Sequence, residues 1–339
     1  MYTFHDQMKK LFGGKVYRLS LSAGCTCPNR DGTLGTGGCI FCSAGGSGDF
    51  AAEGDDLLLQ MEKAKQKVAG KIGKQTAFAG YMAYFQPFTN TYGEEDRLAE
   101  LFWRAASLPD IVALSVATRP DCLSERMVAC LSQINRTKPV FVELGLQTIH
   151  PDTADYINRC YDLDVFSSAF LRLKAAGLNV VAHVIIGLPG EDAQRTKETV
   201  SYLAGLRYQK DFPESPLAAP AADEHFPRQA CLDGIKLQLL YVLRNTALAD
   251  LLPEKIELLP EENELIRPHR YIQLRDGMHL SQYTLEEYAD LIRELVDLLP
   301  DGTAIHRMTG DPPKRDLLLP QWAAEKKKVI NTIRAKMCL

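Results

Sequence analysis

Four cysteines fall within residues 25–42, and they are the side chains of this chain best suited to chemistry: Cys25, Cys27, Cys39 and Cys42. Thiolates bind soft metals, and they must converge on the metal from several directions of the backbone. Glycine permits the backbone angles of such a wrapping loop, and four glycines lie between these cysteines: Gly32, Gly35, Gly37 and Gly38. The pattern therefore predicts a metal centre, which either a zinc ion or an iron–sulfur cluster would fit.

The rest of the sequence has no feature of an exported or membrane-embedded protein. The first residues lack a basic region followed by an apolar one, and no apolar stretch reaches the roughly 18 residues of a membrane span. We therefore expect a cytoplasmic chain without a membrane partner, in which the nine cysteines stay reduced and clustered thiols act as ligands. The five scattered cysteines are expected to be small buried residues: Cys122, Cys130, Cys160, Cys231 and Cys338.

Composition places the chain among globular proteins with a full-sized core. It has 339 residues, of which 46% are hydrophobic, and a formal net charge of −4. This charge excludes a protein whose whole surface attracts nucleic acid, whereas a local basic patch remains compatible with it.

Strand-like and helix-like segments alternate along most of the chain. Strands are predicted at residues 15–22, 78–85, 111–117, 140–146, 179–186 and 234–242, with helices at 57–72, 94–107, 124–134, 153–158, 166–176 and 193–206. This order predicts an α/β fold with a parallel sheet, open or curled toward a barrel. Residues 207–232 contain four prolines and predict a surface loop. Residues after 251 predict an appended α+β segment, with a helix at 284–299, a strand at 303–307 and a basic C-terminal helix.

Polar clusters follow the ends of five predicted strands. They occupy residues 25–42, 86–92, 118–121, 147–148 and 187–191. Because ligands of parallel α/β folds bind at the carboxyl ends of the strands, these loops predict one shared site.

Several of these loops and strands carry distinctive short motifs. They read Ala-Tyr-Phe-Gln-Pro-Phe-Thr-Asn-Thr-Tyr (83–92), Thr-Arg-Pro-Asp-Cys-Leu (118–123), Val-Glu-Leu-Gly-Leu-Gln-Thr (142–148), Ile-Asn-Arg (157–159), Ala-His-Val-Ile-Ile-Gly-Leu-Pro-Gly-Glu (182–191) and Ile-His-Arg-Met-Thr-Gly-Asp (305–311). With the cysteine loop, and in this order, the motifs resemble the radical S-adenosylmethionine (SAM) superfamily. The resemblance is to the branch that contains the catalytic subunit of the Elongator complex and the smaller bacterial YhcC-type proteins.

The resemblance implies a (β/α)6 partial TIM barrel as the radical SAM core over residues 1–250, followed by a small C-terminal α+β extension over residues 251–339. It implies a [4Fe-4S] cluster held by Cys27, Cys39 and Cys42, with one iron left open to chelate SAM. Homolysis of SAM would give a 5′-deoxyadenosyl radical that abstracts hydrogen from a substrate. An electron donor such as flavodoxin or ferredoxin is implied as a partner.

The resemblance also implies which residues would contact SAM. Phe41 matches an aromatic position near the adenine, and Gln86 replaces a motif that often binds the SAM amino group. Further matches are Glu143 and Gln147 for the ribose or methionyl end, and Ile185 and Gly187 for the adenine. Two alternatives are an ion pair between Glu143 and Arg119, and a simple turn at residues 187–190. His183 is expected to be a hydrogen-bonded interior residue.

Two cysteines depart from the family pattern. Cys25 shares a face with Cys27 on an extended backbone, so it could substitute as a ligand or complete a four-thiolate zinc site. Cys160 follows the Asn-Arg pair where relatives usually have glycine and histidine, which makes it a candidate hydrogen donor, although a buried inert thiol is the alternative. Arg119 and Cys160 are the candidate catalytic residues.

The Elongator subunit modifies the wobble uridine of tRNA, so tRNA is a candidate substrate and partner of this chain. Two lysine groups could contact phosphate: a stripe of Lys63, Lys67, Lys71 and Lys74, and a C-terminal group of Lys326, Lys327, Lys328, Arg334 and Lys336. The alternatives are a radical SAM enzyme acting on a small molecule or a protein, and a zinc-stapled RNA-binding protein without catalysis.

Overall fold

The structure is a computed structural model that describes residues 1–46, 48, 50–52, 54, 56–72, 77–208, 231–260, 268 and 270–337. Most of the predicted loop at residues 207–232, as well as Lys74 and Cys338, lies outside the described residues. No helix in the described part of the chain is long and apolar enough to cross a membrane.

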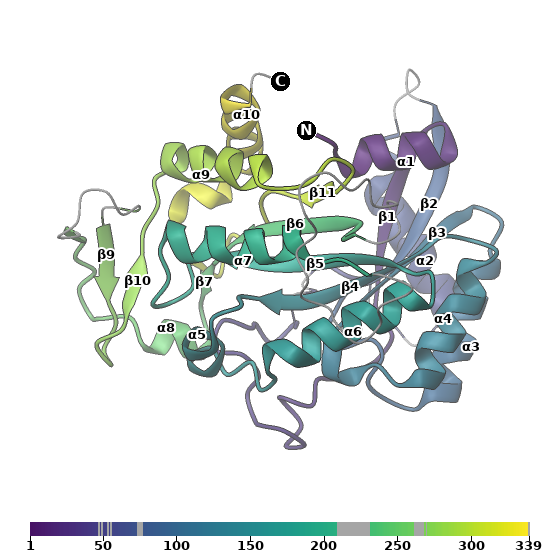
Figure 1. Ribbon diagram of the computed structural model, residues 1–339, viewed down its shortest axis with the longest axis horizontal. Coiled ribbons are helices and arrows are strands. Elements are labelled where there is room, and N and C mark those ends of the chain that lie inside the picture. Colours follow the sequence, from purple (N-terminus) through teal and green to yellow (C-terminus); the bar gives the residue numbers. More distant parts are fainter. Residues whose placement is uncertain are drawn as a thin grey trace.

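A curled sheet of seven parallel strands forms the centre of the molecule, and helices cover its outer face (Figure 1). In spatial order the strands are β1 (Lys15–Leu21), β2 (Phe78–Phe85), β3 (Ile111–Thr118), β4 (Val140–Gln147), β5 (Asn179–Ile186), β6 (Gly234–Leu239) and β11 (Ala304–Arg307). The predicted α/β fold with a partial TIM barrel is thus confirmed. The sheet has one more strand than predicted, because β11 pairs with β6 instead of staying in a separate extension.

The covering helices connect successive strands, as their sequence pattern predicts. They are α2 (Leu57–Ala69), α3 (Glu95–Ser107), α4 (Glu125–Asn135), α5 (Pro151–Tyr156), α6 (Leu163–Ala175) and α7 (Ala193–Gly205). Side chains of Asp56, Ser124 and Asp192 accept hydrogen bonds from the first turns of α2, α4 and α7, which fixes where these helices begin. The apolar faces of the helices and the outer face of the sheet form the main core.

The concave face of the sheet is filled in layers, because every second residue of a strand points inward. The layer at the amino ends is apolar, and helix α1 (Phe4–Phe12) contributes to it: Met8, Val16, Met82, Ala113, Phe141 and Val181. Two residues further along the strands the layer becomes polar: Arg18, Tyr84, Ser115, Glu143, His183 and Lys236. Helix α1 was not predicted, although Thr3 and Asp6 form a capping box at its start.

The C-terminal part adds both to the sheet and to its surroundings. The predicted helices appear as α9 (Leu285–Asp297) and α10 (Lys326–Lys336), and the predicted strand is β11. Short elements that were not predicted are β7 (Val242–Leu243), α8 (Ala247–Asp250), β12 (Leu317–Leu319) and an antiparallel sheet of β8 (Leu259–Pro260), β9 (Arg270–Gln273) and β10 (His279–Ser281). The domain boundary near residue 250 stays a prediction, and β11 shows that the sheet itself runs across it.

A substitution at Gly234 tests how tightly β6 and β11 meet. A Cβ at this position would lie 2.7 Å from two ring atoms of His306, which Gln7 and Arg18 hold in place by hydrogen bonds. We expect Gly234→Ala to lower the free energy of unfolding by about 1–3 kcal/mol in urea titrations, because the buried ring must shift.

The matched control is Gly205→Ala at the end of α7, where nothing lies within 4 Å of an added Cβ. This substitution should be neutral or stabilise by less than about 1 kcal/mol. Equal effects of the two substitutions would contradict the packing described for β6 and β11.

Candidate functional site

A pocket opens at the carboxyl ends of the strands, where the predicted site was expected. Its lining includes most of the residues singled out from the sequence, among them Cys27, Cys39, Phe41, Cys42, Gln86, Arg119, Glu143, Gln147 and His183. Ile185 also lines it, whereas Gly187, Cys25 and Cys160 are not part of the lining. The structure therefore brings together cysteines and polar side chains from loops that are far apart in the sequence.

The cysteine loop wraps around itself through hydrogen bonds of its own backbone. The N–H groups of Arg30 and Cys42 donate to the carbonyls of Cys27 (2.8 Å) and Cys39 (2.9 Å). Gly38 has φ +84°, and a Cβ there would meet the Arg30 Nε at 2.8 Å, so only glycine fits this turn. The Arg30 guanidinium donates to the carbonyls of Cys42 (3.0 Å) and Ser43, which ties both ends of the loop together.

The three cysteines of the lining are close enough to influence one another. Burial raises the pKa of the Cys39 thiol to about 12, and the neighbouring Cys42 and Cys27 thiols add to the rise against the opposing effect of Arg119. Within the described residues, no three His, Cys, Asp or Glu side chains are placed to hold a single metal ion. Thiolates around a cluster of several irons need not meet at one point, so the three cysteines suit a cluster as donors.

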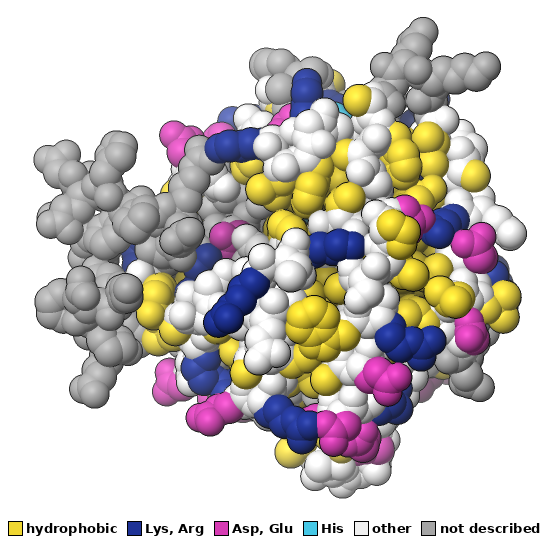
Figure 2. Space-filling view, turned by 90° about the vertical axis from the view of Figure 1, so that its right-hand side faces the viewer, with side chains coloured by type: hydrophobic (Ala, Val, Ile, Leu, Met, Phe, Trp, Pro, Cys, Tyr) yellow, Lys and Arg dark blue, Asp and Glu magenta, His cyan; other side chains and the backbone are white. Residues whose placement is uncertain are grey.

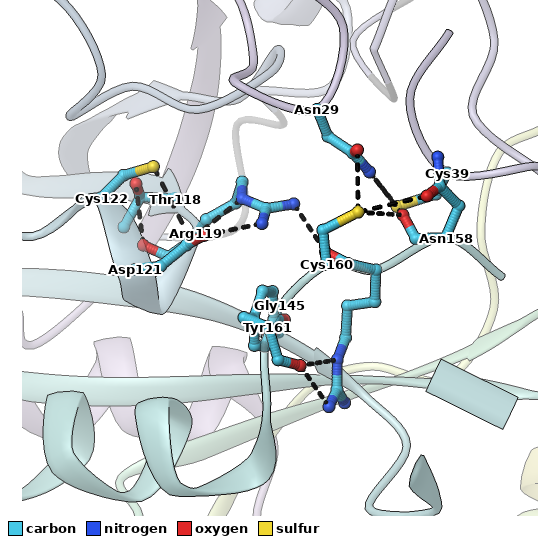
Figure 3. Close-up of polar contacts among 11 residues, drawn as sticks. Asn29, Cys39, Thr118, Arg119, Asp121, Cys122, Gly145, Asn158, Cys160 and Tyr161 are labelled. Carbon is cyan, nitrogen blue, oxygen red and sulfur yellow. Dashed lines mark hydrogen bonds and ion pairs between the residues drawn. The ribbon is translucent and has the colours of Figure 1, made fainter. Parts of the chain in front are cut away.

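The other two cysteines of interest point elsewhere. The Cys25 sulfur lies 3.9 Å from a guanidinium nitrogen of Arg97 on α3, outside the pocket. Cys160 is exposed, and its thiol donates to the side-chain oxygens of Asn29 and Asn158, each at 3.1 Å (Figure 3). The Asn29 amide also lies 3.8 Å from the Cys39 sulfur. The expectation that Cys160 is a small buried residue is thus wrong, and Cys160 contacts the cysteine loop through Asn29; Cys122, Cys130 and Cys231 are only partly buried.

The predicted alternative of an ion pair between Glu143 and Arg119 is wrong. Arg119 instead pairs with Asp121, through its Nε at 2.9 Å and an Nη at 2.7 Å, and it donates to the carbonyl of Arg159 at 3.0 Å (Figure 3). The guanidinium groups of Arg119 and Arg159 lie over the ring of Tyr161, at 4.9 Å and 4.5 Å from its centroid, respectively. Arg119 is therefore a lining residue whose position is fixed by its neighbours.

Glu143 belongs to the polar layer beneath the pocket. Its carboxylate accepts hydrogen bonds from Ser115 (2.9 Å), His183 (3.0 Å) and Lys236, whose Nζ also donates to the Tyr84 hydroxyl (2.9 Å). The hydrogen-bonded interior position expected for His183 is thus confirmed. Lys236 was missed by sequence reasoning, although a lysine inside an otherwise apolar strand is a signal of a buried partner.

Burial and the charges of neighbouring groups shift the pKa values of Glu143, Lys236 and His183 in this layer. Burial alone would raise the pKa of Glu143, but Lys236 and the hydrogen bond from His183 hold it well below its usual range. Burial lowers the pKa of Lys236 to about 7, with Glu143 opposing and the cations Arg18 and Arg307 adding to the fall. Burial, followed by the charge of Lys236, lowers the pKa of His183 to about 4, so His183 is neutral at pH 7.

Gln147, which lines the pocket, and Gly187, which does not, both have a positive φ angle. Gln147 has φ +69°, and its buried Oε1 has no hydrogen-bond partner in the described part of the chain. Gly187 lies beyond the lining, with the ring of Tyr283 3.3 Å from where a Cβ would be. The cofactor contacts assigned to Phe41, Gln86, Ile185 and Gly187 stay predictions.

The remaining wall of the pocket comes from β6 and the segment around β11, which sequence reasoning did not connect with the site. Gln238, Tyr241, Arg307 and Gly310 line it. The Tyr241 hydroxyl accepts a hydrogen bond from the N–H of Gly310 (2.7 Å), and a Cβ on Gly310 would meet the tyrosine ring at 2.4 Å. Glycine is therefore required here for the loop after β11 to reach the pocket rim.

Comparisons with known proteins agree with this geometry. The profile of the radical SAM superfamily matches residues 27–203, and that of the radical SAM C-terminal domain matches residues 275–338. YtqA of Bacillus subtilis is 34% identical over 340 residues, covering 99% of this chain and 89% of YtqA. YhcC of Escherichia coli is 28% identical over 320 residues, covering 94% of this chain and 86% of YhcC.

More distant similarities connect the chain with Elongator-type proteins. The tRNA uridine(34) acetyltransferase of Methanocaldococcus jannaschii is 33% identical over 87 residues, which are 26% of this chain and 16% of that protein. Among solved structures, the archaeal Methanocaldococcus infernus Elp3 superimposes with a TM-score of 0.56 at 15% identity over 95% of this chain. The chain covers 63% of that structure, which shows the same fold.

The buried lysine makes stability depend on pH in a predictable direction. In the unfolded chain Lys236 titrates near pH 10, whereas in the folded chain its pKa falls to about 7. Between these values the unfolded chain binds a proton that the folded chain does not, so the free energy of unfolding should rise with pH. The contribution is at most about 1.4 kcal/mol per pH unit.

Urea titrations between about pH 7 and about pH 10 measure this rise. Lys236→Met should lose it, and should also be destabilised by about 3–5 kcal/mol because Glu143 stays buried without its cation. Lys255→Met is the control, since the side chain of Lys255 is 84% exposed. An unchanged rise in Lys236→Met would show that another group causes it.

Proposed function

We propose, because the chain belongs to the radical SAM superfamily, that it is an enzyme that holds a [4Fe-4S] cluster through Cys27, Cys39 and Cys42 and binds SAM in the pocket beside them. The observation that carries this proposal is the position of all three thiols in the lining of one pocket with the loops that follow β2, β3 and β4. When bound, the cluster supplies the electron that splits SAM into methionine and a 5′-deoxyadenosyl radical. A small redox protein such as flavodoxin or ferredoxin would deliver that electron.

The donor set fits the cluster, and the residues around it fit SAM. Three thiolates satisfy three irons, which leaves one iron for the amino and carboxylate groups of SAM. The unpartnered Oε1 of Gln147 can accept a hydrogen bond from a ribose hydroxyl or from the amino group. The Glu143 oxygens already accept from Ser115, His183 and Lys236, so we assign the direct contact to Gln147 and a supporting role to Glu143.

Iron content separates the cluster ligands from the neighbouring cysteine. After anaerobic reconstitution, Cys39→Ala should lose the iron, the acid-labile sulfide and the brown colour, because no nearby thiol replaces it. Cys25→Ala is the matched control and should keep all three, since Cys25 contacts Arg97 outside the pocket. Iron retained in Cys39→Ala, or lost in Cys25→Ala, would refute the ligand assignment.

The same preparation tests the reaction. With dithionite, the wild-type protein should slowly form 5′-deoxyadenosine and methionine from SAM without substrate, and chromatography measures both products. A chain that binds zinc and forms no 5′-deoxyadenosine would instead support the zinc-stapled RNA-binding protein.

We propose tRNA as the substrate on the strength of the similarity to a tRNA uridine(34) acetyltransferase, and of where the basic C-terminal helix lies. Helix α10 begins beside the pocket, because Lys326 pairs at 2.5 Å with Asp311, which lines the mouth. The helix is therefore closer to the site than the sequence alone indicated. A small molecule or a protein remains the alternative substrate.

The lysine stripe of α2 gives weaker support. Figure 2 shows the side of the molecule formed by α2, α3 and α4, where lysine and arginine are interspersed with aspartate and glutamate. Lys65, between two members of the stripe, pairs with Glu62 (3.2 Å) and Asp110 (2.8 Å). Mixed charges of this kind are typical of an ordinary solvated surface.

Salt dependence tests whether α10 contacts phosphate. If tRNA binds, its affinity should fall with salt, and each lysine that neutralises a phosphate contributes roughly −0.7 to −0.9 to the slope of log affinity against log salt. Replacing Lys326, Lys327 and Lys328 by glutamine should flatten this slope. Replacing Lys63 and Lys67 is the matched control and should leave it unchanged.

Nucleoside analysis of tRNA from a deletion strain is the independent measurement, with a change expected at uridine C5. An unchanged nucleoside profile together with weak, salt-insensitive tRNA binding would contradict tRNA as the substrate.

A further inference from the structure

We propose that the substrate of this enzyme carries an anionic group, a carboxylate or a phosphate, and that Arg307 binds it at the wall of the pocket formed by β6 and β11. The inference rests on the proposed function, because it concerns the substrate of that same site. It names a residue of the C-terminal part of the chain as the determinant of specificity.

A β-bulge directs Arg307 into the pocket. Ile305 pairs with Ile235, but Arg307 pairs with Lys236, so two residues of β11 lie opposite one step of β6. Such an irregularity changes where neighbouring side chains point. His306 is consequently buried against Gln7 and Arg18, while the next residue, Arg307, lines the pocket instead of facing the opposite side of the sheet.

The Arg307 guanidinium keeps N–H donors that are available to a ligand. One Nη of Arg307 donates a hydrogen bond of 3.2 Å to the side-chain oxygen of Gln238, which also lines the pocket. Among the described residues, no carboxylate forms an ion pair with it, in contrast to Arg119, which Asp121 neutralises. A guanidinium presents five N–H donors in a planar fork that matches a carboxylate or a phosphate.

The charges around Arg307 do not balance within the described part of the chain. Glu143, the carboxylate of the polar layer, pairs with Lys236. Asp311, which also lines the pocket, pairs with Lys326. Among the described residues, the buried Arg18 and the lining Arg307 are thus left without a carboxylate in an ion pair. The nearby histidines do not add to this excess, because burial keeps the pKa of both His183 and His306 below the usual range and favours their neutral forms. An anion beside Arg307 would offset this excess positive charge in a site of low dielectric constant.

The carboxylate of bound SAM would be a second source of negative charge, and under the proposed function it would lie at the other end of the pocket, beside the cysteines. Arg119 donates to the carbonyl of Arg159, and the next residue, Cys160, contacts Asn29 of the cysteine loop, so the charge of Arg119 lies toward the cysteine end. Arg307 lies opposite Lys236 in the strand pairing and donates to Gln238, so its charge lies at the wall formed by β6 and β11. The two cationic ends therefore suit two different ligands.

Anion binding by the anaerobically reconstituted full chain tests the proposal. Calorimetric titrations with inorganic phosphate and with acetate, at constant ionic strength, distinguish the two kinds of group. We expect saturable binding of at least one anion by the wild type, and at least about tenfold weaker binding by Arg307→Gln. Arg307→Lys should bind with intermediate affinity, because it keeps the charge and loses the fork. The preference for phosphate or acetate identifies the group that the substrate carries.

Arg315→Gln is the matched control, since Arg315 is 89% exposed and lies outside the pocket lining, and it should bind like the wild type. Thermal unfolding midpoints of all variants show that each is folded. Three results would overturn the inference: no saturable anion binding by the wild type, equal binding by Arg307→Gln, or one-for-one displacement of the anion by SAM. Substrate-free SAM cleavage by the wild type, measured on the same preparation, reports on the proposed function alone, so the two failures are distinguishable.

Discussion

The ion pair between Glu143 and Lys236, in the middle of the curled sheet, is the interaction on which the rest of the site depends. Both side chains are almost completely buried, and removal of two charges from water is unfavourable unless each finds partners. Ser115, His183 and Tyr84 supply them from β3, β5 and β2. The pair and its hydrogen bonds thereby connect the five neighbouring strands β2 to β6, so the same contacts fix the curvature of the sheet and the floor of the pocket.

This polar layer also separates two regions of different character. Toward the amino ends the interior is apolar and is closed by α1, whereas toward the carboxyl ends it opens into the pocket. An apolar layer in the place of Glu143 and Lys236 would give comparable stability in general. Charged groups at the floor of a pocket are instead typical of functional sites, because they shift the pKa values and set the electrostatic potential that a ligand meets.

Periodicity was sufficient to predict the sheet and its covering helices, because parallel strands buried on both faces are nearly continuous apolar runs. The strands predicted at residues 78–85 and 179–186 match β2 and β5 residue for residue. The strands of the β8–β9–β10 sheet are only two to four residues long, too short for a periodic pattern, whereas helix α1 was missed although its capping box is visible in the sequence. Local sequence could not reveal that β11 completes the sheet, because that pairing joins segments far apart in the chain.

For the candidate site, too, topology could be predicted from the sequence, whereas contacts between distant segments could not. Loops after successive strands could be assigned to one rim from topology alone, and most of the residues selected there line the pocket. Tyr241 and Arg307 could not be assigned, because their contribution depends on β11 lying beside β6 and on the bulge between them. The cysteine end of the pocket is thus built by loops of the first half of the chain, while the opposite wall is built by its C-terminal part. Sequence changes around β6 and β11 can therefore alter that wall of the pocket without changing the loop that carries the three cysteines.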